Sequence, residues 1–241
     1  MTKPYLSVVI PAYNEQERIV STLLAVDQYL KKQTYTAEIV VISDGSKDHT
    51  GQVVRDLKPR IKNLRLIDNK KNHGKGYVVR QAMLKARGKY RLFMDADHST
   101  DISHLEKVWL YFKQNYDIAI GSIEVKGAKI HEETGWYKRM FGHWSKLLIR
   151  IVLLPEILDS QRGFKCFTAK AVKDIFPRQR IERWGFDMEI LAIANKLHYK
   201  IKEFPVVWKN VGKTEVKPLA YIKTFKELFQ IKWNLITGKY K

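Results

Sequence analysis

Two aspartates, Asp95 and Asp97, directly follow the apolar segment 90–94 (YRLFM). Residues i and i+2 of a strand point the same way, so both carboxylates can reach one ion at the end of the strand. Mg²⁺ and Mn²⁺ prefer carboxylate and phosphate oxygens and commonly bind through one or two protein carboxylates together with a substrate phosphate. The spacing therefore predicts a divalent-cation site that neutralises a diphosphate.

Three more polar segments follow apolar runs earlier in the chain, namely 11–15 (PAYNE), 44–46 (DGS) and 72–76 (NHGKG). Carboxylates such as Glu15 and Asp44 can accept hydrogen bonds from a base or a ribose. Lys75 lies between two glycines at the start of a predicted helix, where close backbone approach and the helix N-terminus favour an anion. The alternative for Lys75 is a solvated side chain on a flexible loop. Together with the two aspartates, these segments predict a nucleotide-sugar site.

The elements that must position these residues alternate along the first half of the chain. We expect strands over 6–10, 38–43, 64–68 and 90–94, and helices over 15–31, 47–57 and 76–86. Short apolar strands that alternate with helices predict a parallel sheet covered on both faces. Right-handed crossovers then place the four strand ends on one edge, where open α/β sheets bind their ligands.

The second half of the chain has a more mixed pattern. We expect a helix over 104–115, a strand over 117–121, a mobile polar loop over 124–135, a turn into a strand over 159–167, a helix entered at 181–191 and a last strand over 201–208. Asp187 and Glu189 lie near the start of a predicted helix, and either carboxylate can face the site. The alternative is a favourable placement of negative charge at a helix N-terminus.

Two segments are apolar and basic at once. In 136–154, large apolar residues are interleaved with lysine and arginine. In 218–239, the expected apolar face consists of Ile222, Phe225, Phe229, Trp233 and Ile236. Each segment has two interpretations: a helix that packs on the protein's own core while its long cations reach solvent, or a helix that lies at a lipid surface.

The composition favours a globular protein with an anionic partner. The 241 residues suit one large domain or two closely packed ones, and 45% hydrophobic residues are ample for a core. Lysine and arginine number 44 against 25 acidic residues, a formal net charge of +19. This excess favours nucleic acid, a phosphorylated substrate or an anionic membrane surface. Nucleic acid is disfavoured, because the basic residues are spread through the chain and no recognised nucleic-acid-binding motif is present.

The chain shows neither a signal peptide nor an uncharged stretch that approaches the ~18–20 residues of a membrane-spanning helix. We therefore expect a cytoplasmic protein that is soluble or peripherally bound to a membrane. The single Cys166 excludes a disulfide framework and a cysteine-based zinc site, and we expect it to be a packing thiol.

The four N-terminal motifs together resemble those of family 2 glycosyltransferases with the GT-A fold, and the resemblance covers almost the whole chain. Three later segments are similar to the branch of dolichyl-phosphate β-glucosyltransferases and bacterial polyprenyl-phosphate glycosyltransferases: 159–167 (DSQRGFKCF), 182–189 (ERWGFDME), and 207–208 (VW) with 212–213 (GK). The resemblance implies an α/β, Rossmann-like fold with a mainly parallel central sheet, flanking helices, and amphipathic helices in the C-terminal half. It further implies a nucleotide-sugar-binding half over 1–122, an acceptor-binding half of the same domain over 123–214, and a C-terminal amphipathic helix over 215–241.

The resemblance also implies roles for individual residues. The nucleotide sugar would be bound by Pro11, Ala12, Tyr13, Glu15, Asp44, Lys75, Asp95 and Asp97. The metal, Mg²⁺ or Mn²⁺, would be held by Asp95 and Asp97. The sugar and acceptor pocket would be formed by Arg139, Asp159, Gln161, Gly163, Phe164, Trp184 and Glu189. Asp97 and Asp187 are the expected catalytic residues.

Two positions depart from the pattern of the family. Ser99 stands where related mannosyltransferases can place a metal-binding Gln, which leaves the third metal ligand open. Ile123 stands where many relatives carry an Arg that is a candidate contact for the acceptor phosphate. Lys138, Arg139 and Arg150 are the candidates to replace it.

The function implied is the inverting transfer of a hexose, with glucose favoured, from a UDP-sugar to a polyprenyl or dolichyl phosphate at the cytoplasmic face of a membrane. A phosphate acceptor is already anionic near neutral pH, so a strong general base is less necessary than for a sugar hydroxyl. The first alternative is transfer to a soluble saccharide or cell-wall polymer, which requires a base for a hydroxyl group, with Asp187 the first candidate. The remote alternative is a basic nucleic-acid-binding protein.

Overall fold

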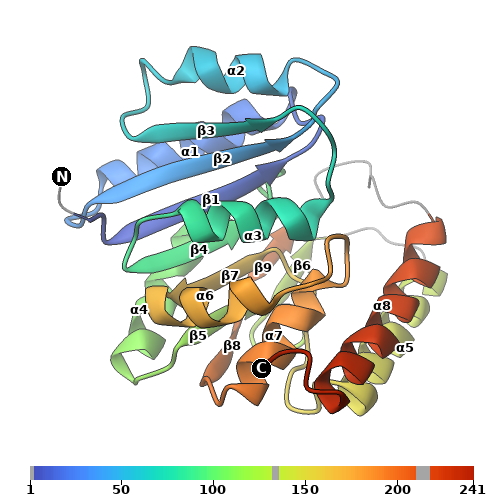
Figure 1. Ribbon diagram of the computed structural model, residues 1–241. Coiled ribbons are helices and arrows are strands. Elements are labelled where there is room, and N and C mark those ends of the chain that lie inside the picture. Colours follow the sequence, from blue (N-terminus) through green and yellow to red (C-terminus); the bar gives the residue numbers. More distant parts are fainter. Residues whose placement is uncertain (1–2, 132–135, 210–217) are drawn as a thin grey trace.

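The computed structural model describes residues 3–131, 136–209 and 218–241. At 136–141, 143 and 218–222 it describes the helical backbone but not the side chains. Its centre is a seven-stranded sheet with the order β3-β2-β1-β4-β7-β5-β8 (Figure 1). The strands are β1 (Leu6–Ala12), β2 (Ala37–Asp44), β3 (Leu64–Asn69), β4 (Tyr90–Met94), β5 (Ile118–Ser122), β7 (Phe164–Thr168) and β8 (Ile201–Pro205). All neighbouring strands are parallel except β7, which runs antiparallel to both β4 and β5. The expected mainly parallel sheet is confirmed.

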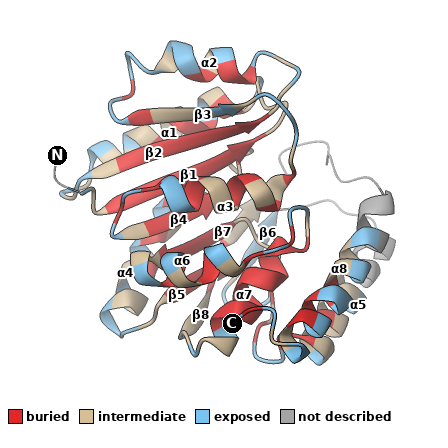
Figure 2. Cartoon of the chain, in the orientation of Figure 1, coloured by how far each residue is buried: buried red, intermediate tan, exposed pale blue. Residues whose placement is uncertain are grey.

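Helices cover both faces of this sheet. They are α1 (Ile19–Lys31), α2 (Thr50–Leu57), α3 (Lys75–Lys85), α4 (Leu105–Lys113), α5 (Trp136–Val152), α6 (Ala169–Ile175), α7 (Phe186–Lys196) and α8 (Pro218–Ile236). Successive strand residues point to opposite faces, so Val9 of β1 joins the core under α3, α6 and α7, whereas Val8 and Ile10 join the core under α1 and α4. Figure 2 shows the resulting continuous burial along the central strands.

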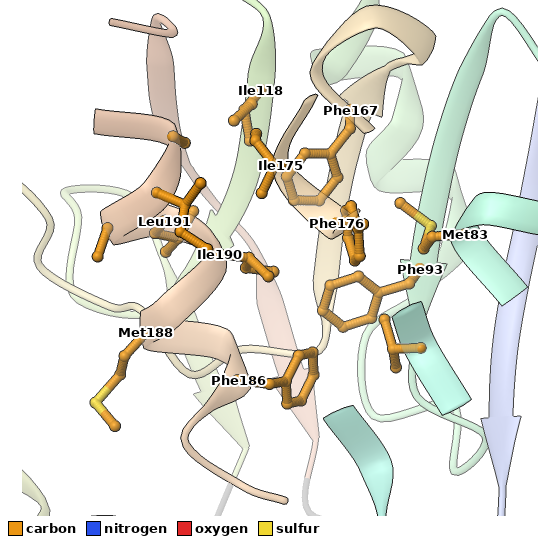
Figure 3. Close-up of a cluster of buried hydrophobic side chains, with 14 of the residues drawn as sticks. Met83, Phe93, Ile118, Phe167, Ile175, Phe176, Phe186, Met188, Ile190 and Leu191 are labelled. Atoms are coloured by element: carbon orange, nitrogen blue, oxygen red, sulfur yellow. The ribbon is translucent and has the colours of Figure 1, made fainter. Parts of the chain in front are cut away.

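Aromatic packing joins the sheet to α7 near the site. The rings of Phe93 on β4 and Phe186 on α7 lie 5.8 Å apart, and Phe167 on β7 packs edge-on against Phe176 at 5.5 Å (Figure 3). Cys166, also on β7, is fully buried in the core on the opposite face of the sheet, and burial raises the pKa of its thiol. The prediction of a packing thiol is confirmed.

The structure corrects two predictions for the second half of the chain. Within the segment expected to be a polar loop, 124–135, residues Lys129–His131 form strand β6, while 132–135 lie outside the described residues. The single strand expected over 201–208 is divided at the buried Val206 into β8 and β9 (Val207–Lys209), and β9 pairs with β6 in a separate two-stranded sheet. Because β6 is exposed along its whole length, it lacks the apolar alternation by which a strand is found in a sequence.

The two amphipathic segments form α5 and α8, which pack against each other at one side of the molecule (Figure 1). On α8, Leu228 and Ile231 are buried, so the helix does pack on the protein's own core. Among the described residues, no helix combines the length and the apolar character needed to cross a bilayer.

Candidate active site

The first two strand ends are joined by hydrogen bonds between side chains and backbone. Downstream of β1, the amide of Glu15 donates to Thr50 Oγ1 at 2.8 Å, and the amide of Gln16 donates to Asp48 Oδ2 at 3.1 Å. Glu15 itself receives a two-pronged contact from the Arg18 guanidinium, at 2.7 and 2.8 Å. Burial raises the pKa of Glu15 in spite of Arg18. The motifs 11–15 and 44–50 therefore form one rigid corner of the sheet edge.

Asp44, the last residue of β2, holds the glycine-rich loop that precedes α3. Its two carboxylate oxygens accept hydrogen bonds from the amides of His73 and Gly74, each at 2.8 Å. Gly74 has a φ of +107°, a backbone conformation that favours glycine. Asp44 thereby places Lys75 at the first position of α3 and turns it toward β4.

Lys75 meets the first aspartate of the pair on β4. Its Nζ lies 2.6 Å from Asp95 Oδ1, and it also lies 5.7 Å from the ring centroid of Trp184. Asp95 is enclosed from the other side by Gly163, where a Cβ would come within 1.9 Å of Asp95 Oδ2. The Asp95 amide donates to the Gly163 carbonyl at 3.1 Å. Asp95 is therefore held in place by α3 on one side and by the start of β7 on the other.

Asp97 has a different environment from Asp95. Its Oδ1 accepts a hydrogen bond from the Ser99 amide at 2.9 Å, and its side chain is partly exposed. The turn between the two aspartates is fixed by Thr22, whose hydroxyl donates to the Ala96 carbonyl at 2.6 Å. Among the described residues, Asp95 is bound to a lysine and Asp97 is not, so Asp97 is the better placed to receive a cation.

A second ion pair lies near the first and is buried. Lys165 on β7 donates to Asp187 Oδ1 at 2.5 Å and to the Arg162 carbonyl at 2.5 Å. Its Nζ lies 5.2 Å from the ring centroid of Phe93. The sequence patterns alone indicated no role for Lys165. A signal was present, because a lysine flanked by Phe164, Cys166 and Phe167 in a buried strand requires a charged partner.

The pKa shifts show that these four charges act on one another. Burial alone would raise the pKa of Asp95, but Lys75, Lys165 and Arg162 together hold the pKa below its usual range. Burial alone would lower the pKa of Lys75, but Asp95 and Asp187 raise it. Burial raises the pKa of Asp187 against the attraction of Lys165 and Lys75. The site is thus a compact group of alternating charges at the strand ends.

The segment 159–163 forms the next part of the site. Asp159 Oδ2 accepts hydrogen bonds from the Ile123 amide and from Arg162 Nε, both at 3.1 Å. The Arg162 guanidinium lies 4.7 Å from the ring centroid of Trp208. The sequence indicated Arg162 only as part of the motif 159–167. In the structure its guanidinium is bound to Asp159, one of the predicted acceptor residues.

The oxygen ligands present suit a Mg²⁺ or Mn²⁺ ion that completes its coordination with diphosphate oxygens and water. Asp97 supplies a partly exposed carboxylate, and Asp95 lies two residues away. Among the described residues, no group of three or more His, Cys, Asp or Glu side chains is placed to hold a metal by itself. Ser99 is buried, and its amide is bound to Asp97. The residues therefore fit an ion that binds together with the nucleotide.

Residues 7–176 match the model of the family described as glycosyl transferase family 2. The chain belongs to this family. A protein named dolichyl-phosphate β-glucosyltransferase from Trichomonas vaginalis is 35% identical to this chain, covering 94% of this chain and 70% of the relative. The protein of that name in Saccharomyces cerevisiae is 34% identical, covering 98% of this chain and 77% of the relative. In Homo sapiens the identity is 30%, over the same shares of the two chains.

Solved structures share the fold of this family 2 glycosyltransferase. Glucosyl-3-phosphoglycerate synthase from Mycobacterium tuberculosis, in complex with Mn²⁺, UDP-glucose and glycerol 3-phosphate, superposes with a TM-score of 0.70 at 14% identity, covering 95% of this chain and 80% of that one. Mannosyl-3-phosphoglycerate synthase from Rubrobacter xylanophilus gives a TM-score of 0.71 at 12% identity, covering 98% and 75%. The expected GT-A fold is confirmed.

Most of the predicted donor residues of this glycosyltransferase gather at one sheet edge. Pro11 and Ala12 are buried at the end of β1, and Tyr13 is half-buried beyond them. Lys75 binds Asp95 and lies over the ring of Trp184, and Asp187 interacts with both charges. Gln161 is exposed. The side chain of Arg139 and the motif residues 212–213 lie outside the described part of the chain.

Two residues expected to line the acceptor pocket lie elsewhere. Phe164 is fully buried and packs against Phe204, with ring centroids 6.1 Å apart, because alternation along β7 turns it into the core. Glu189 is also fully buried, and its oxygens accept hydrogen bonds from the amides of Arg180 and Ile181 and from the Tyr240 hydroxyl. The helical period explains this placement, since residue 189 follows Asp187 by about 200° around α7. Glu189 therefore anchors the C-terminus to the segment before α7.

Proposed function

We propose that this glycosyltransferase transfers glucose, with inversion, from UDP-glucose to a polyprenyl phosphate of the dolichyl phosphate type. Relatives at 30–35% identity bear the name of that activity. The observation that carries the proposal is the group Lys75, Asp95, Asp97, Lys165 and Asp187 at the strand ends of the GT-A fold. This group combines a binding place for a metal ion and the donor diphosphate with a buried lysine, Lys165. Lys165 is bound to the carbonyl of Arg162 in the acceptor segment.

In the proposed reaction, Asp97 would hold a Mg²⁺ or Mn²⁺ ion, which would supply neutralisation of the charge on the UDP leaving group. Asp95 positions the donor and is itself fixed by Lys75 and Gly163. Pro11, Ala12, Tyr13, Glu15 and the loop held by Asp44 line the nucleoside end of the donor. Alignment of donor and acceptor supplies much of the rate, and such alignment contributes up to ~7–11 kcal/mol in favourable cases.

The acceptor end of the proposed site is formed by Asp159, Gln161, Arg162, Trp184 and Asp187. An acceptor phosphate is already anionic, so no side chain has to remove a proton from it. Arg162 lies next to position 123 in space, since its Nε and the Ile123 amide both donate to Asp159 Oδ2. It thereby becomes a candidate for the role of the arginine that Ile123 replaces, beside Lys138, Arg139 and Arg150.

The proposal divides the chain into a nucleotide-sugar-binding half over 1–122, an acceptor-binding half over 123–214 and a C-terminal helix over 215–241. Because its acceptor is a membrane lipid, the protein works peripherally at the cytoplasmic face of a membrane and not on nucleic acid. The rival is a glycosyltransferase with a soluble saccharide acceptor, for which Asp187 would be the base.

The test is a product analysis by mass spectrometry. The purified protein is incubated with Mg²⁺ or Mn²⁺, a pool of UDP- and GDP-sugars, and vesicles that contain a polyprenyl phosphate. We expect a hexosyl-phosphoryl-polyprenol and an equal amount of UDP, both lost in Asp97→Asn and when the metal is chelated. Release of UDP without a glycolipid would favour the rival function, transfer to a soluble saccharide acceptor. If a folded sample yields neither the glycolipid nor free UDP, the proposed function is overturned.

A further inference from the structure

Large apolar side chains are exposed on one stripe of α8. Phe225, Phe229, Trp233 and Ile236 expose 37%, 57%, 62% and 70% of their surface. Their spacing of four, four and three residues places them on the same side of a helix. Isolated exposed apolar residues are ordinary in proteins, but a contiguous set marks an interaction surface.

This stripe is not the face by which α8 packs on the protein. The opposite face buries Leu228, Ile231 and Asn234. Glu227 anchors the helix further, since its Oε2 accepts a hydrogen bond from the Gly185 amide at 2.7 Å. The stripe therefore stays exposed on a helix that is firmly held, and it is not the inner face of a displaced helix.

Helix α5, which packs against α8, adds to the exposed apolar surface. Trp144 and Ile151 expose 61% and 73% of their surface and lie seven residues apart, on one side of α5. Six of the nine large apolar side chains that are exposed among the described residues belong to these two helices. Figures 1 and 2 show α5 and α8 side by side at the margin of the fold. We call these six residues the outer surface of the α5–α8 pair.

The charge around this surface selects its partner. Residues 223–241 contain five lysines and one carboxylate, Glu227, which is already bound to Gly185. Lys223, Lys226 and Lys232 are exposed beside the apolar stripe. The sequence of α5 contains lysine and arginine but no acidic residue. A second copy of the chain would bring the same cations together, so self-association through this surface is disfavoured.

We propose that the outer surface of the α5–α8 pair is the face by which the protein lies on an anionic lipid bilayer. The aromatic and aliphatic side chains enter the boundary between headgroups and acyl chains, where Trp and Phe are favoured. The lysines contact lipid phosphates. The inference rests on the proposed function only in that a lipid acceptor gives the enzyme a reason to be at a membrane.

A contact between α8 and the start of α7 links the proposed membrane surface to the active site. Glu227 of α8 binds the amide of Gly185, two residues before Asp187. A Cβ at Gly185 would come within 2.7 Å of Glu227 Oε2, so α8 and the start of α7 approach as closely as glycine allows. A helix that rests on the bilayer therefore sits in direct contact with the element that carries Asp187 into the site.

The experiment measures binding to vesicles without any substrate, so that it does not depend on catalysis. Flotation is compared for vesicles of phosphatidylcholine alone and with about 30% phosphatidylglycerol, at about 0.1 M and 0.5 M salt. The apolar variant is Phe229→Ser/Trp233→Ser, and the charge variant is Lys226→Gln/Lys232→Gln. The matched control is Leu84→Ser/Leu110→Ser, which removes two exposed leucines on α3 and α4.

We expect the native protein and the control to bind anionic vesicles and to lose binding as salt rises. The apolar variant should bind at least about ten-fold more weakly, because two partly inserted side chains are lost. The charge variant should bind more weakly and depend less on salt. Circular dichroism should show no change in fold, since all of these side chains are exposed.

Unchanged binding of the apolar variant, or equal binding to neutral vesicles, would overturn the inference. So would a native dimer in analytical ultracentrifugation that the apolar variant dissociates, because the surface would then join two copies of the chain. Glucosylation of a short, water-soluble prenyl phosphate separates the two proposals. If that reaction proceeds equally in native protein and apolar variant while neither binds vesicles, the membrane inference alone fails. If vesicles bind but no donor or acceptor reacts, the proposed function alone fails.

Discussion

Lys165 on β7 and Asp187 on α7 form an ion pair of 2.5 Å in the interior of the site, with the lysine fully buried. The same Nζ is bound to the carbonyl of Arg162, so one lysine joins β7, the segment before it and the start of α7. Two charges removed from water are costly unless they satisfy each other. The pair therefore makes the geometry of the site depend on the correct packing of α7 on the sheet.

Replacement of Lys165 by Met should destabilise the protein severely. It leaves Asp187 buried without its partner, and removal of one member of a buried pair costs ~3–5 kcal/mol. The free energy of unfolding in urea measures the loss. The double variant Lys165→Met/Asp187→Asn should recover part of it, because no unpaired charge remains. The control Lys31→Met breaks the exposed pair with Asp27 and should cost less than about 1 kcal/mol. Additive losses in the double variant would contradict this account.

Replacement of Asp97 by Asn should reduce turnover by at least ~100-fold, since a preorganised group that stabilises leaving-group charge contributes that much. The fold should remain intact because the side chain is partly exposed. Mn²⁺ binding in the presence of UDP, followed by electron paramagnetic resonance, should weaken in parallel. Asp56→Asn, an exposed aspartate on α2, is the matched control. A variant with near-native turnover would remove Asp97 from the metal site.

Replacement of Gly163 by Ala should impair donor binding. The new Cβ would come within 1.9 Å of Asp95 Oδ2, so the carboxylate that Lys75 holds would have to move. Calorimetric titration with UDP-glucose should show a weaker affinity. Gly142→Ala is the matched control, because a Cβ at this helical position meets nothing within 4 Å. Equal affinities in the two variants would show that the position of Asp95 does not matter for the donor.

Glu38 should make the stability depend on pH in the acidic range. Burial alone would raise its pKa, but hydrogen bonds from the Ser7 hydroxyl and the Arg87 amide and the ion pair with Arg65 hold the pKa below its usual value. A lowered pKa stabilises the folded state above the unfolded value of about 4.3, and this contribution is lost as pH falls through the folded value. Urea unfolding between about pH 3 and 6 should show a smaller loss in Glu38→Gln than in the native protein. The exposed variant Glu17→Gln should retain the native slope.

The sequence determined the donor half of the site because its signals are local. An apolar strand, the polar residue that ends it and the glycine before the next helix are close in the chain, so 90–97 and 72–76 could be placed by pattern alone. The short apolar runs of the strands and their alternation with helices also predicted the parallel sheet. The sequence did not determine whether Phe229 and Trp233 are exposed or buried, because an amphipathic pattern does not show which face of a helix is covered.

The tertiary structure alone decided which side chains of the second half reach the site. Lys165 and Asp187 are separated by 22 residues, and only the packing of α7 on β7 brings them together. Glu189 resembles Asp187 in sequence, yet the turn of the helix carries it to Tyr240. The pairing of the exposed strand β6 with β9 likewise joins segments that are distant in the chain. Contacts of this kind depend on long-range packing, which leaves no periodic signal in the chain.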